Sequence, residues 1–323
     1  MLAKAAACAL AAAAMLSPAL AADKPTVRPV PGTDCPTFPA DSWFHADISG
    51  LPVHKKSAAW MKNMSSDRNL HPDFGPSYGE QKVPYGIPIT VVDGRHPKVK
   101  VRFRYASQSD RVRYPLGDDT KVEGGQYKSG DRHTVVIDRD TCRLYETWAT
   151  ARDGKKWSAG SGAVWDLESY DLRPDGWTSA DAAGLPIMPL LLRWDLVRKG
   201  KVDHAIRFTT DVTDRSYLWP ARHQAGSVND PDYPPMGARF RLKKGYAIEG
   251  SLRADTKAVL EAMKRYGLVL ADNGSPWYFQ GTADKNWPKG LIEELKQIPA
   301  SAFEAVDTSS LMISEDSMRV KAK

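Results

Sequence analysis

The sequence predicts a mainly β protein: a two-sheet sandwich of the jelly-roll or lectin-like type, with two C-terminal helices. Short alternating or β-branched segments recur through the middle of the chain, polar turns separate them, and both helical patterns come late. An α+β single domain is the alternative. No linker divides the chain after Trp43, so residues 43–312 are expected to form one domain.

The first residues have the pattern of an export signal. Lys4 precedes an apolar run from Ala5 to Leu16, and Ala19-Leu20-Ala21 is a small-x-small cleavage site. We expect residues 1–21 to be removed and the mature protein to be periplasmic or secreted. The run is shorter than the roughly 20 apolar residues of a spanning helix, and no later stretch is long enough, so no membrane span is expected.

The chain carries 45 basic and 39 acidic residues, a formal charge of +6. Removal of residues 1–21 takes away one lysine and no acid, which leaves +5. No block of Lys and Arg exceeds three residues, so a nucleic-acid partner is not expected. The mild basic charge fits an anionic polymer better.

Residues 22–42 are rich in proline and are expected to form an extended arm on the domain surface. Cys35 and Cys142 are the two cysteines that remain after export, and we expect them to form one disulfide. Neither has a second Cys or His at ligand spacing, which argues against zinc. Residues 313–323 are charged and are expected to fray.

Strand patterns fall into regular order along the chain. Residues 99–105 alternate strictly between apolar and basic side chains, which predicts a strand with one buried face. Residues 134–138 and 143–148 predict a hairpin with a turn at Arg139-Asp140. The other expected strands are residues 87–92, a pair of short segments within 157–165, 204–209, 238–243, 268–271 and an edge strand at 303–307.

Two helices are expected near the C-terminus. Asp255 is a suitable N-cap for residues 256–266, and Gly267 follows as the C-terminal stop. Pro288 suits the first helical position of a segment that runs from Lys289 to Gln297.

No strong catalytic signature is present. The chain contains no HExxH, GxSxG, P-loop or dinucleotide fingerprint. His71-Pro72-Asp73 offers two metal ligands without a third, so neither a metal nor any other cofactor is expected.

Two loops combine chemically useful residues. In the segment 173–186, Trp177 and Asp181 are expected to line a cleft; the structural alternative is that Thr178 and Asp181 only cap a short helical turn. The segment 217–223 predicts a strand that runs into a loop. There His223 is a candidate general base and Arg222 a candidate partner for a substrate carboxylate, whereas a surface histidine and a structural arginine are the alternative.

Further binding candidates lie on strands and at strand ends. Asp272 follows the buried segment 268–271, Asn273 belongs to the same turn, and Trp277 lies just beyond it. His133 and His204 lie on expected strands, where a histidine buried in the core is the alternative.

Six runs spread over most of the mature chain give a resemblance: HPDFG (71–75), GWTSADAAGLPI (176–187), HAIRFT (204–209), WPARH (219–223), PPMGARFRLK (234–243) and YGLVLADNGSPW (266–277). The chain resembles a group of secreted bacterial proteins of uncharacterised function. The resemblance implies export and a single domain.

Tryptophans beside polar loop residues suit sugar rings, because indole stacks on apolar C–H faces while polar neighbours bind hydroxyls. We therefore expect an exported enzyme that cleaves a polysaccharide or oligosaccharide in a Trp-lined cleft. Catalytic candidates are Asp181, Arg222, His223 and Asp272; substrate-binding candidates are Trp177, Asn273, Trp277, His204 and His133.

Two chemistries remain open at this point. A glycoside hydrolase needs two carboxylates, for which Asp181, Asp272, Glu123 and Asp166 are candidates. A uronate lyase needs a base and a group that neutralises the substrate carboxylate, for which His223, Arg222, Asn273 and Tyr266 are candidates. The alternative to both is a non-catalytic glycan-binding or cell-envelope protein.

Overall fold

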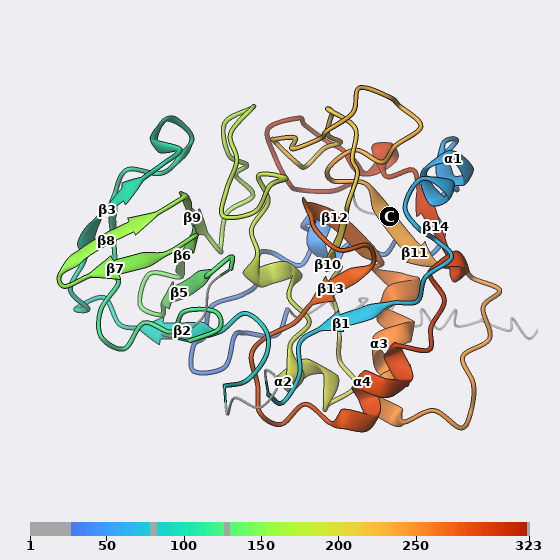
Figure 1. The fold of residues 1–323 in the computed structure, drawn as a ribbon, viewed down its shortest axis with the longest axis horizontal. Coiled ribbons are helices and arrows are strands. Elements are labelled where there is room, and N and C mark those ends of the chain that lie inside the picture. The colour runs from blue at the N-terminus through green and yellow to red at the C-terminus, as the bar shows by residue number, and fades with distance from the viewer. Residues whose placement is uncertain (1–26, 78–82, 126–129, 322–323) are drawn as a thin grey trace, which may run out of the picture.

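The computed structural model describes residues 27–77, 83–125 and 130–321 (Figure 1). The expected signal peptide, residues 1–21, lies outside the described residues. The strands are β1 (His71–Asp73), β2 (Ile89–Val92), β3 (Val99–Phe103), β4 (Arg113–Tyr114), β5 (Thr134–Asp138), β6 (Arg143–Trp148), β7 (Ala151–Asp153), β8 (Lys156–Ala159), β9 (Ser161–Asp166), β10 (Ile206–Thr210), β11 (Arg239–Leu242), β12 (Leu268–Asn273), β13 (Tyr278–Gln280) and β14 (Phe303–Val306). The α-helices are α1 (Ser57–Lys62), α2 (Trp194–Val197), α3 (Ala254–Arg265) and α4 (Lys289–Leu295).

The strands form three sheets, which confirms the mainly β prediction. The largest has the order β1-β13-β10-β12-β11-β14, the second β2-β5-β6-β9, and the third β4-β3-β8-β7. Each includes a parallel pair, such as β10 with β12 or β2 with β5. Jelly rolls are antiparallel, so the finer prediction of a jelly-roll or lectin-like sandwich stays a prediction.

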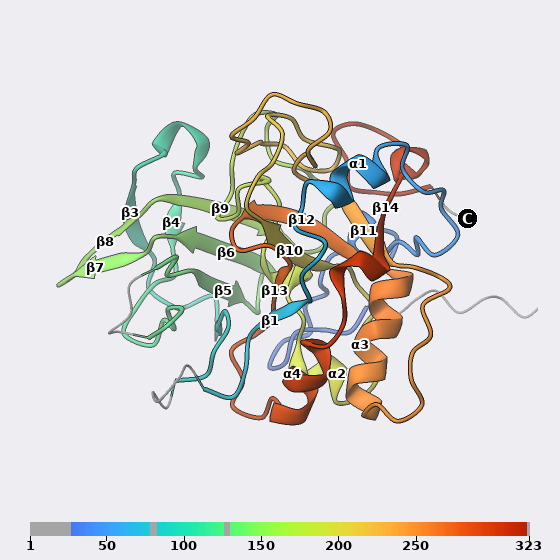
Figure 2. The same cartoon turned by 45° about the vertical axis from the view of Figure 1, so that its right-hand side comes forward.

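The second sheet is buried on both faces, which explains why β5 is buried at every position. Val135 and Ile137 face the main core, which also holds Phe208 and Phe240 of the six-stranded sheet. Val136 faces a smaller core with Tyr145 and aromatic residues of the third sheet. One apolar cluster therefore joins the first two sheets, and the third is attached through the second (Figures 1 and 2).

The two expected C-terminal helices are present, with α2, α3 and α4 gathered at one end of the six-stranded sheet (Figure 2). Helix α3 begins at Ala254, two residues before the expected start, because Arg253 is the N-cap and Asp255 lies in the first turn. Gly267 follows its C-cap with a φ of 75°, as expected of a C-terminal glycine. Helix α4 ends at Leu295, and Pro288 is its N-cap rather than its first residue.

Three expectations about chain segments need correction. Residues 217–223 form no strand and make only an isolated bridge from Tyr217 to Met236. Residues 313–321 do not fray, because Met318 is fully buried and bridges tie Ser317 to Asp171 and Val320 to Met312. The described part of the proline-rich arm, residues 27–42, is packed rather than superficial, since Val30 and Phe38 belong to the main core.

Cys35 and Cys142 form the expected disulfide. It links the arm to the turn between β5 and β6. The two cysteines are 107 residues apart in the sequence. In the part of the chain that the structure describes, no helix has both the length and the apolar character to cross a bilayer.

Replacement of Cys35 and Cys142 by alanine is expected to lower the free energy of unfolding by about 2–4 kcal/mol, because a long loop regains entropy in the unfolded chain. Urea titrations of both proteins measure the difference. A reductant is the control, since it should lower the midpoint of the wild type and leave the variant unchanged. Equal midpoints before reduction would contradict the prediction.

Candidate functional site

The chemically useful residues meet where β10 and β12 end. These strands are parallel, so their carboxyl ends lie at the same edge of the sheet, the usual position of a ligand site in sheets with parallel strands. Arg207 and Thr209 lie on β10, and Asp272 and Asn273 end β12.

A β-bulge in β12 directs Asp272 toward Arg207. Phe208 pairs with Leu270 but Thr209 pairs with Asp272, so Ala271 is the extra residue. Strict alternation from Val269 would have placed Asp272 on the opposite face from Arg207, and the bulge reverses this. The carbonyl oxygen of Ala271 accepts a hydrogen bond from the N–H of Ala183, 2.9 Å away, and so fixes the loop that carries Asp181.

Asp181 and Arg207 form a buried two-pronged ion pair. Arg207 donates from Nη2 to Oδ1 of Asp181 at 2.7 Å and from Nε to Oδ2 at 3.1 Å. Both side chains are almost completely buried. Asp181 is therefore committed to Arg207 and acts in positioning rather than as a free acid or base.

Asp272 is the carboxylate left without a full partner. Its Oδ2 lies 4.0 Å from Nη2 of Arg207, and 28 % of its side chain is exposed. Enclosure by protein and the neighbouring Asp181 carboxylate raise the pKa of Asp272 to about 7, although Arg207 opposes this. The side chain can thus both donate and accept a proton near neutral pH.

Two adjoining hollows meet at Asp131, Asp272 and Asn273, which line both. The first, of about 410 Å³, is called here the indole hollow; its walls include Tyr105, Gln108, Asp131, Trp148, Asp181, His223, Asp272 and Asn273. The second, of about 250 Å³, is called the acidic hollow; its walls include Asp73, Glu123, Asp131, His133, Arg207, Asp272, Tyr278 and Gln280.

His223 lines the indole hollow and is fixed by one ring nitrogen to the loop that carries Asp181. Its Nδ1 lies 2.8 Å from the carbonyl oxygen of Ala182. A carbonyl oxygen only accepts, so Nδ1 is the donor in this hydrogen bond.

His133 and Glu123 form a second pair in the acidic hollow. Nδ1 of His133 lies 2.7 Å from Oε2 of Glu123, and among the described residues Nε2 of His133 has no hydrogen-bond partner. Burial alone would lower the pKa of His133, but the Glu123 carboxylate raises it above its ordinary value. Conversely, His133 keeps the pKa of Glu123 low despite the enclosure of that side chain. His133 thus lies in the cleft, as the sequence suggested.

Aromatic rings line the indole hollow, but they are not the predicted ones. Trp148 ends β6, and its ring stacks near that of Tyr105, with centroids 6.3 Å apart and planes inclined by 25°. Gly160 makes room for this ring, since a Cβ there would lie 2.1 Å from Trp148. Nε1 of Trp148 donates to Oδ1 of Asp131 at 3.1 Å and links the ring to the shared carboxylate.

Several predicted site residues lie elsewhere. Trp277 is fully buried in the main core, where its Nε1 donates to the carbonyl of Met64. Trp177 packs against the guanidinium of Arg173 instead of lining either hollow. His204 is buried beside Ala205, and burial lowers its pKa to about 4, which makes it a neutral core histidine.

Arg222 and Asn273 are occupied by the protein. Arg222 donates from Nη2 to Asp316, 3.1 Å away, and from Nη1 to the carbonyl of Glu315. Asn273 lines both hollows, but its amide is engaged on both sides, by Ala225 and Thr213. Of the other acid and base candidates, Asp166 pairs with Arg143, and Tyr266 lines neither hollow.

Sequence reasoning missed Asp131, Trp148, Tyr105 and Gln280, and it considered Asp73 only as a metal ligand. The hairpin register offered one signal. Extended beyond Thr134 and Thr147, it places Asp131 opposite Thr150, and the N–H of the adjacent Ala149 donates to the carbonyl of Asp131.

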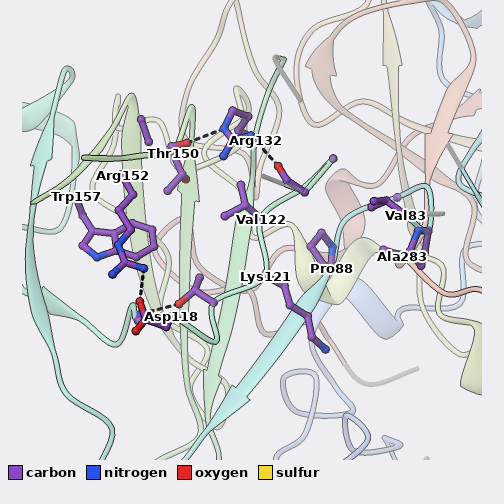
Figure 3. A pocket seen from close by; sticks show the side chains of 17 residues that line it. Val83, Pro88, Asp118, Lys121, Val122, Arg132, Thr150, Arg152, Trp157 and Ala283 are labelled. Carbon is purple, nitrogen blue, oxygen red and sulfur yellow. Dashed lines mark hydrogen bonds and ion pairs between the residues drawn. The ribbon is translucent and has the colours of Figure 1, made fainter. Parts of the chain in front are cut away.

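A further hollow, of about 690 Å³, is at a different place, and its described lining residues hold no comparable chemistry (Figure 3). Arg152 lies over Trp157 and pairs with Asp118, while Arg132 donates to the carbonyls of Thr150 and Gly125. Among the described lining residues, the charged groups are thus engaged with one another or with the backbone, and none of these residues is a histidine.

Glu146 anchors the chain that follows the Asp181 loop. This fully buried carboxylate on β6 accepts hydrogen bonds from the N–H groups of Ile187 and Met188 and from Nε1 of Trp165. Burial raises its pKa to about 7, although these hydrogen bonds favour the charged form.

Glu146→Gln is expected to flatten the pH dependence of stability. The folded chain holds a proton on Glu146 up to about pH 7, whereas the unfolded chain releases it near pH 4.5, so stability from this group falls as pH rises between those values. The loss between pH 5 and pH 8 should shrink by about 2–3 kcal/mol in the variant. Urea titrations at both pH values test this, and an unchanged slope would contradict it.

Among the described residues, no group of three or more His, Cys, Asp or Glu side chains has the arrangement of a metal site. Comparisons of the chain with protein-family models, curated proteins and solved structures give no match. The chemistry of the cleft is therefore the basis for a functional proposal.

Proposed function

We propose that the protein is an exported glycoside hydrolase whose active site is the cleft between Trp148 and Asp272. The observation that carries the proposal is that two carboxylates, Asp272 and Asp131, line one hollow together with the aromatic rings of Tyr105 and Trp148, and that enclosure raises the pKa of Asp272 to about 7. Asp272 would protonate the leaving oxygen, and Asp131 would activate water or attack the sugar. The disulfide and the export signal of the sequence support a periplasmic or secreted location.

The charge of the cleft favours hydrolysis over elimination. A uronate lyase must neutralise its substrate carboxylate, yet Arg222 pairs with Asp316 and the amide of Asn273 is occupied. Of the described lining residues, Arg207 is the one Lys or Arg in the two hollows, and it is bound to Asp181. Five carboxylates line the same space: Asp73, Glu123, Asp131, Asp181 and Asp272. Arg207 offsets Asp181 and His133 offsets Glu123, and the remaining carboxylates suit a neutral glycan better than the anionic polymer that the net charge suggested.

A panel of neutral, amino and uronate polysaccharides tests this proposal with the mature protein, residues 22–323. We expect new reducing ends from neutral or amino glycans and no rise in absorbance near 235 nm. Unsaturated product from a uronate polymer would contradict hydrolysis and would show that the protein is a lyase.

A glycan-binding protein without turnover is the second candidate. The stacked rings of Tyr105 and Trp148 favour it, because such a pair holds a sugar without any acid or base. Binding of a panel glycan without new reducing ends would support this candidate.

Trp148→Ala is expected to raise the KM for the best substrate about three- to tenfold, because a stacking surface is lost, and also to lower kcat, because Asp131 loses the hydrogen bond from Nε1. Trp177→Ala is the matched control, since that indole packs on Arg173 outside the cleft. Initial rates over a range of substrate concentrations give both constants. Equal effects of the two substitutions would argue against sugar stacking on Trp148.

A further inference from the structure

The outer face of the third sheet carries basic side chains that the proposed function does not use. This sheet lies at the left end of the molecule in Figure 1, and its inner face packs on the smaller core through Phe103, Tyr114 and Trp157. Successive residues of a strand point to opposite faces, so the residues between these positions point away from the core. On β3 they are Lys100 and Arg102, and both are exposed.

Neighbouring strands extend this charged surface. Arg113 on β4 lies directly across from Lys100, and Lys156 on β8 is exposed on the same face. Arg104 continues the series just beyond β3, with its Cζ 5.9 Å from the centroid of the Trp148 ring. These residues are called here the basic face: Lys100, Arg102, Arg104, Arg113 and Lys156.

The charges of the basic face have no counter-charge in the part of the chain that the structure describes. Exposed arginines elsewhere pair with carboxylates, as Arg265 does with Asp47. No described carboxylate forms an ion pair with a member of the basic face, and Arg113 donates only to the carbonyl of Lys98. Asp153 on β7 is the one acid at the described outward positions of this sheet.

This arrangement opposes folding rather than assisting it. Lys100 and Arg113 are direct cross-strand neighbours, and like charges so placed repel each other. Charges that protect a sheet from aggregation lie on its edge strands, which here are β4 and β7, whereas Lys100 and Arg102 lie on the inner strand β3. An anionic partner would remove the repulsion, so the placement of these charges points to binding.

The spacing of the charges suits a polymer with repeated anionic groups. Outward residues lie about 6.6 Å apart along a strand and strands about 4.8 Å apart, so the face offers several cations side by side. Most of them are arginines, whose fork geometry matches carboxylate and sulfate groups. A membrane-bound face carries large apolar side chains as well, and the described outward positions hold none, since the uncharged ones are Ala151 and Ser158.

We propose that the basic face is a docking surface for an anionic polysaccharide, held by ion pairs to its repeated carboxylate or sulfate groups. None of the five residues is among the described residues that line the indole hollow or the acidic hollow, so the inference does not depend on the proposed function. Arg104 adjoins Tyr105 of the indole hollow, and a polymer bound here would therefore lie beside the cleft.

Binding of defined polymers to the mature protein, residues 22–323, tests the inference without any turnover. Polygalacturonate, dextran sulfate and neutral dextran are immobilised, and binding is followed by interferometry. We expect both anionic polymers to bind at low salt, neutral dextran not to bind, and the affinity to fall as salt is added, because exposed ion pairs are screened. Equal binding of neutral dextran, or no binding of either anionic polymer, would overturn the inference.

The triple variant Lys100→Gln/Arg102→Gln/Lys156→Gln assigns the binding to the basic face and leaves Arg104 beside the cleft unchanged. Loss of three exposed ion pairs is expected to weaken polygalacturonate binding about tenfold. Because repulsion is removed, the urea midpoint should not fall. If the triple variant does not fold, Arg102→Gln decides, and wild-type affinity for both anionic polymers in that variant would overturn the inference.

The matched control is Arg198→Gln/Lys199→Gln/Lys201→Gln, which also removes one arginine and two lysines, from an exposed cluster after α2. It should bind polygalacturonate within about twofold of the wild type, because it leaves the basic face intact. Equal losses in the two triple variants would mean that net charge alone holds the polymer, and the docking surface would be rejected.

Vesicles separate a polysaccharide from a lipid surface. Phosphatidylcholine vesicles with and without phosphatidylglycerol are compared at the salt concentration at which polygalacturonate binds. We expect neither to bind as tightly as the polymer. Tighter binding to the anionic vesicles, lost in the triple variant of the basic face, would assign this face to a membrane and overturn the proposal.

Discussion

Asp272→Asn is expected to reduce glycan hydrolysis by about 10²–10⁴-fold, because an amide cannot supply the proton that the leaving oxygen needs. The substitution preserves the shape of the side chain, and the N–H of Asn273 can still donate to the remaining amide oxygen. Binding of the glycan should therefore persist. Initial rates of reducing-end release and a separate binding titration measure the two effects.

The pH profile gives this assignment a second test. A general acid works only while protonated, and burial beside Asp181 raises the pKa of Asp272 to about 7. Wild-type kcat/KM is therefore expected to fall about tenfold per pH unit above neutrality. The residual activity of Asp272→Asn should lack this decline.

Asp153→Asn is the matched control, since Asp153 lies on the exposed strand β7 and lines neither hollow. It should keep the wild-type rate and the wild-type pH profile. A rate for Asp272→Asn within a fewfold of that control would show that Asp272 is not the acid.

Local patterns in the sequence were sufficient for much of the fold. Alternation of apolar and basic residues located β3, and the paired runs before and after Arg139-Asp140 located the hairpin of β5 and β6. Two cysteines in a chain with an export signal were sufficient for the disulfide. The order of strands in the sheets could not be predicted in this way. Parallel pairs such as β10 with β12 join segments about 60 residues apart, and nothing in either segment indicates its partner.

Asp272 could be predicted as a site residue, but its orientation could not. A carboxylate at the end of a buried strand is unusual, and that singled out Asp272. The bulge at Ala271, which turns Asp272 to the face of Arg207, has no sequence signature, since alanine fits a regular strand equally well.

The tryptophan predictions were wrong because the residue types next to a tryptophan do not determine whether its ring is buried or faces a cleft. Trp277 follows a polar turn, yet its indole faces inward because Met64 supplies a partner for its N–H and Phe208 and Phe240 pack on the ring. Trp148 ends a predicted strand, and it faces the cleft because Gly160 leaves room for the ring. In both cases a residue distant in sequence determines which side of the chain the ring occupies.

Arg207→Met is expected to lower the free energy of unfolding by about 3–5 kcal/mol, because it leaves the buried carboxylate of Asp181 without its counter-charge. The double variant Arg207→Met/Asp181→Asn is the matched control. It removes both charges, so it should recover a large part of the loss. Urea titrations at pH 7 compare the three proteins, and equal losses in the single and double variants would contradict an uncompensated charge as the cause.

Asp181→Asn alone connects this ion pair to the chemistry. It removes the carboxylate that helps to raise the pKa of Asp272, and it frees Arg207, whose Nη2 is already 4.0 Å from Oδ2 of Asp272. Both changes favour the charged form of Asp272, so the decline in kcat/KM should begin below pH 7. A decline that stays near pH 7 in this variant would mean that burial alone sets the pKa of Asp272, and that Asp181 and Arg207 serve only to hold the loop on β10.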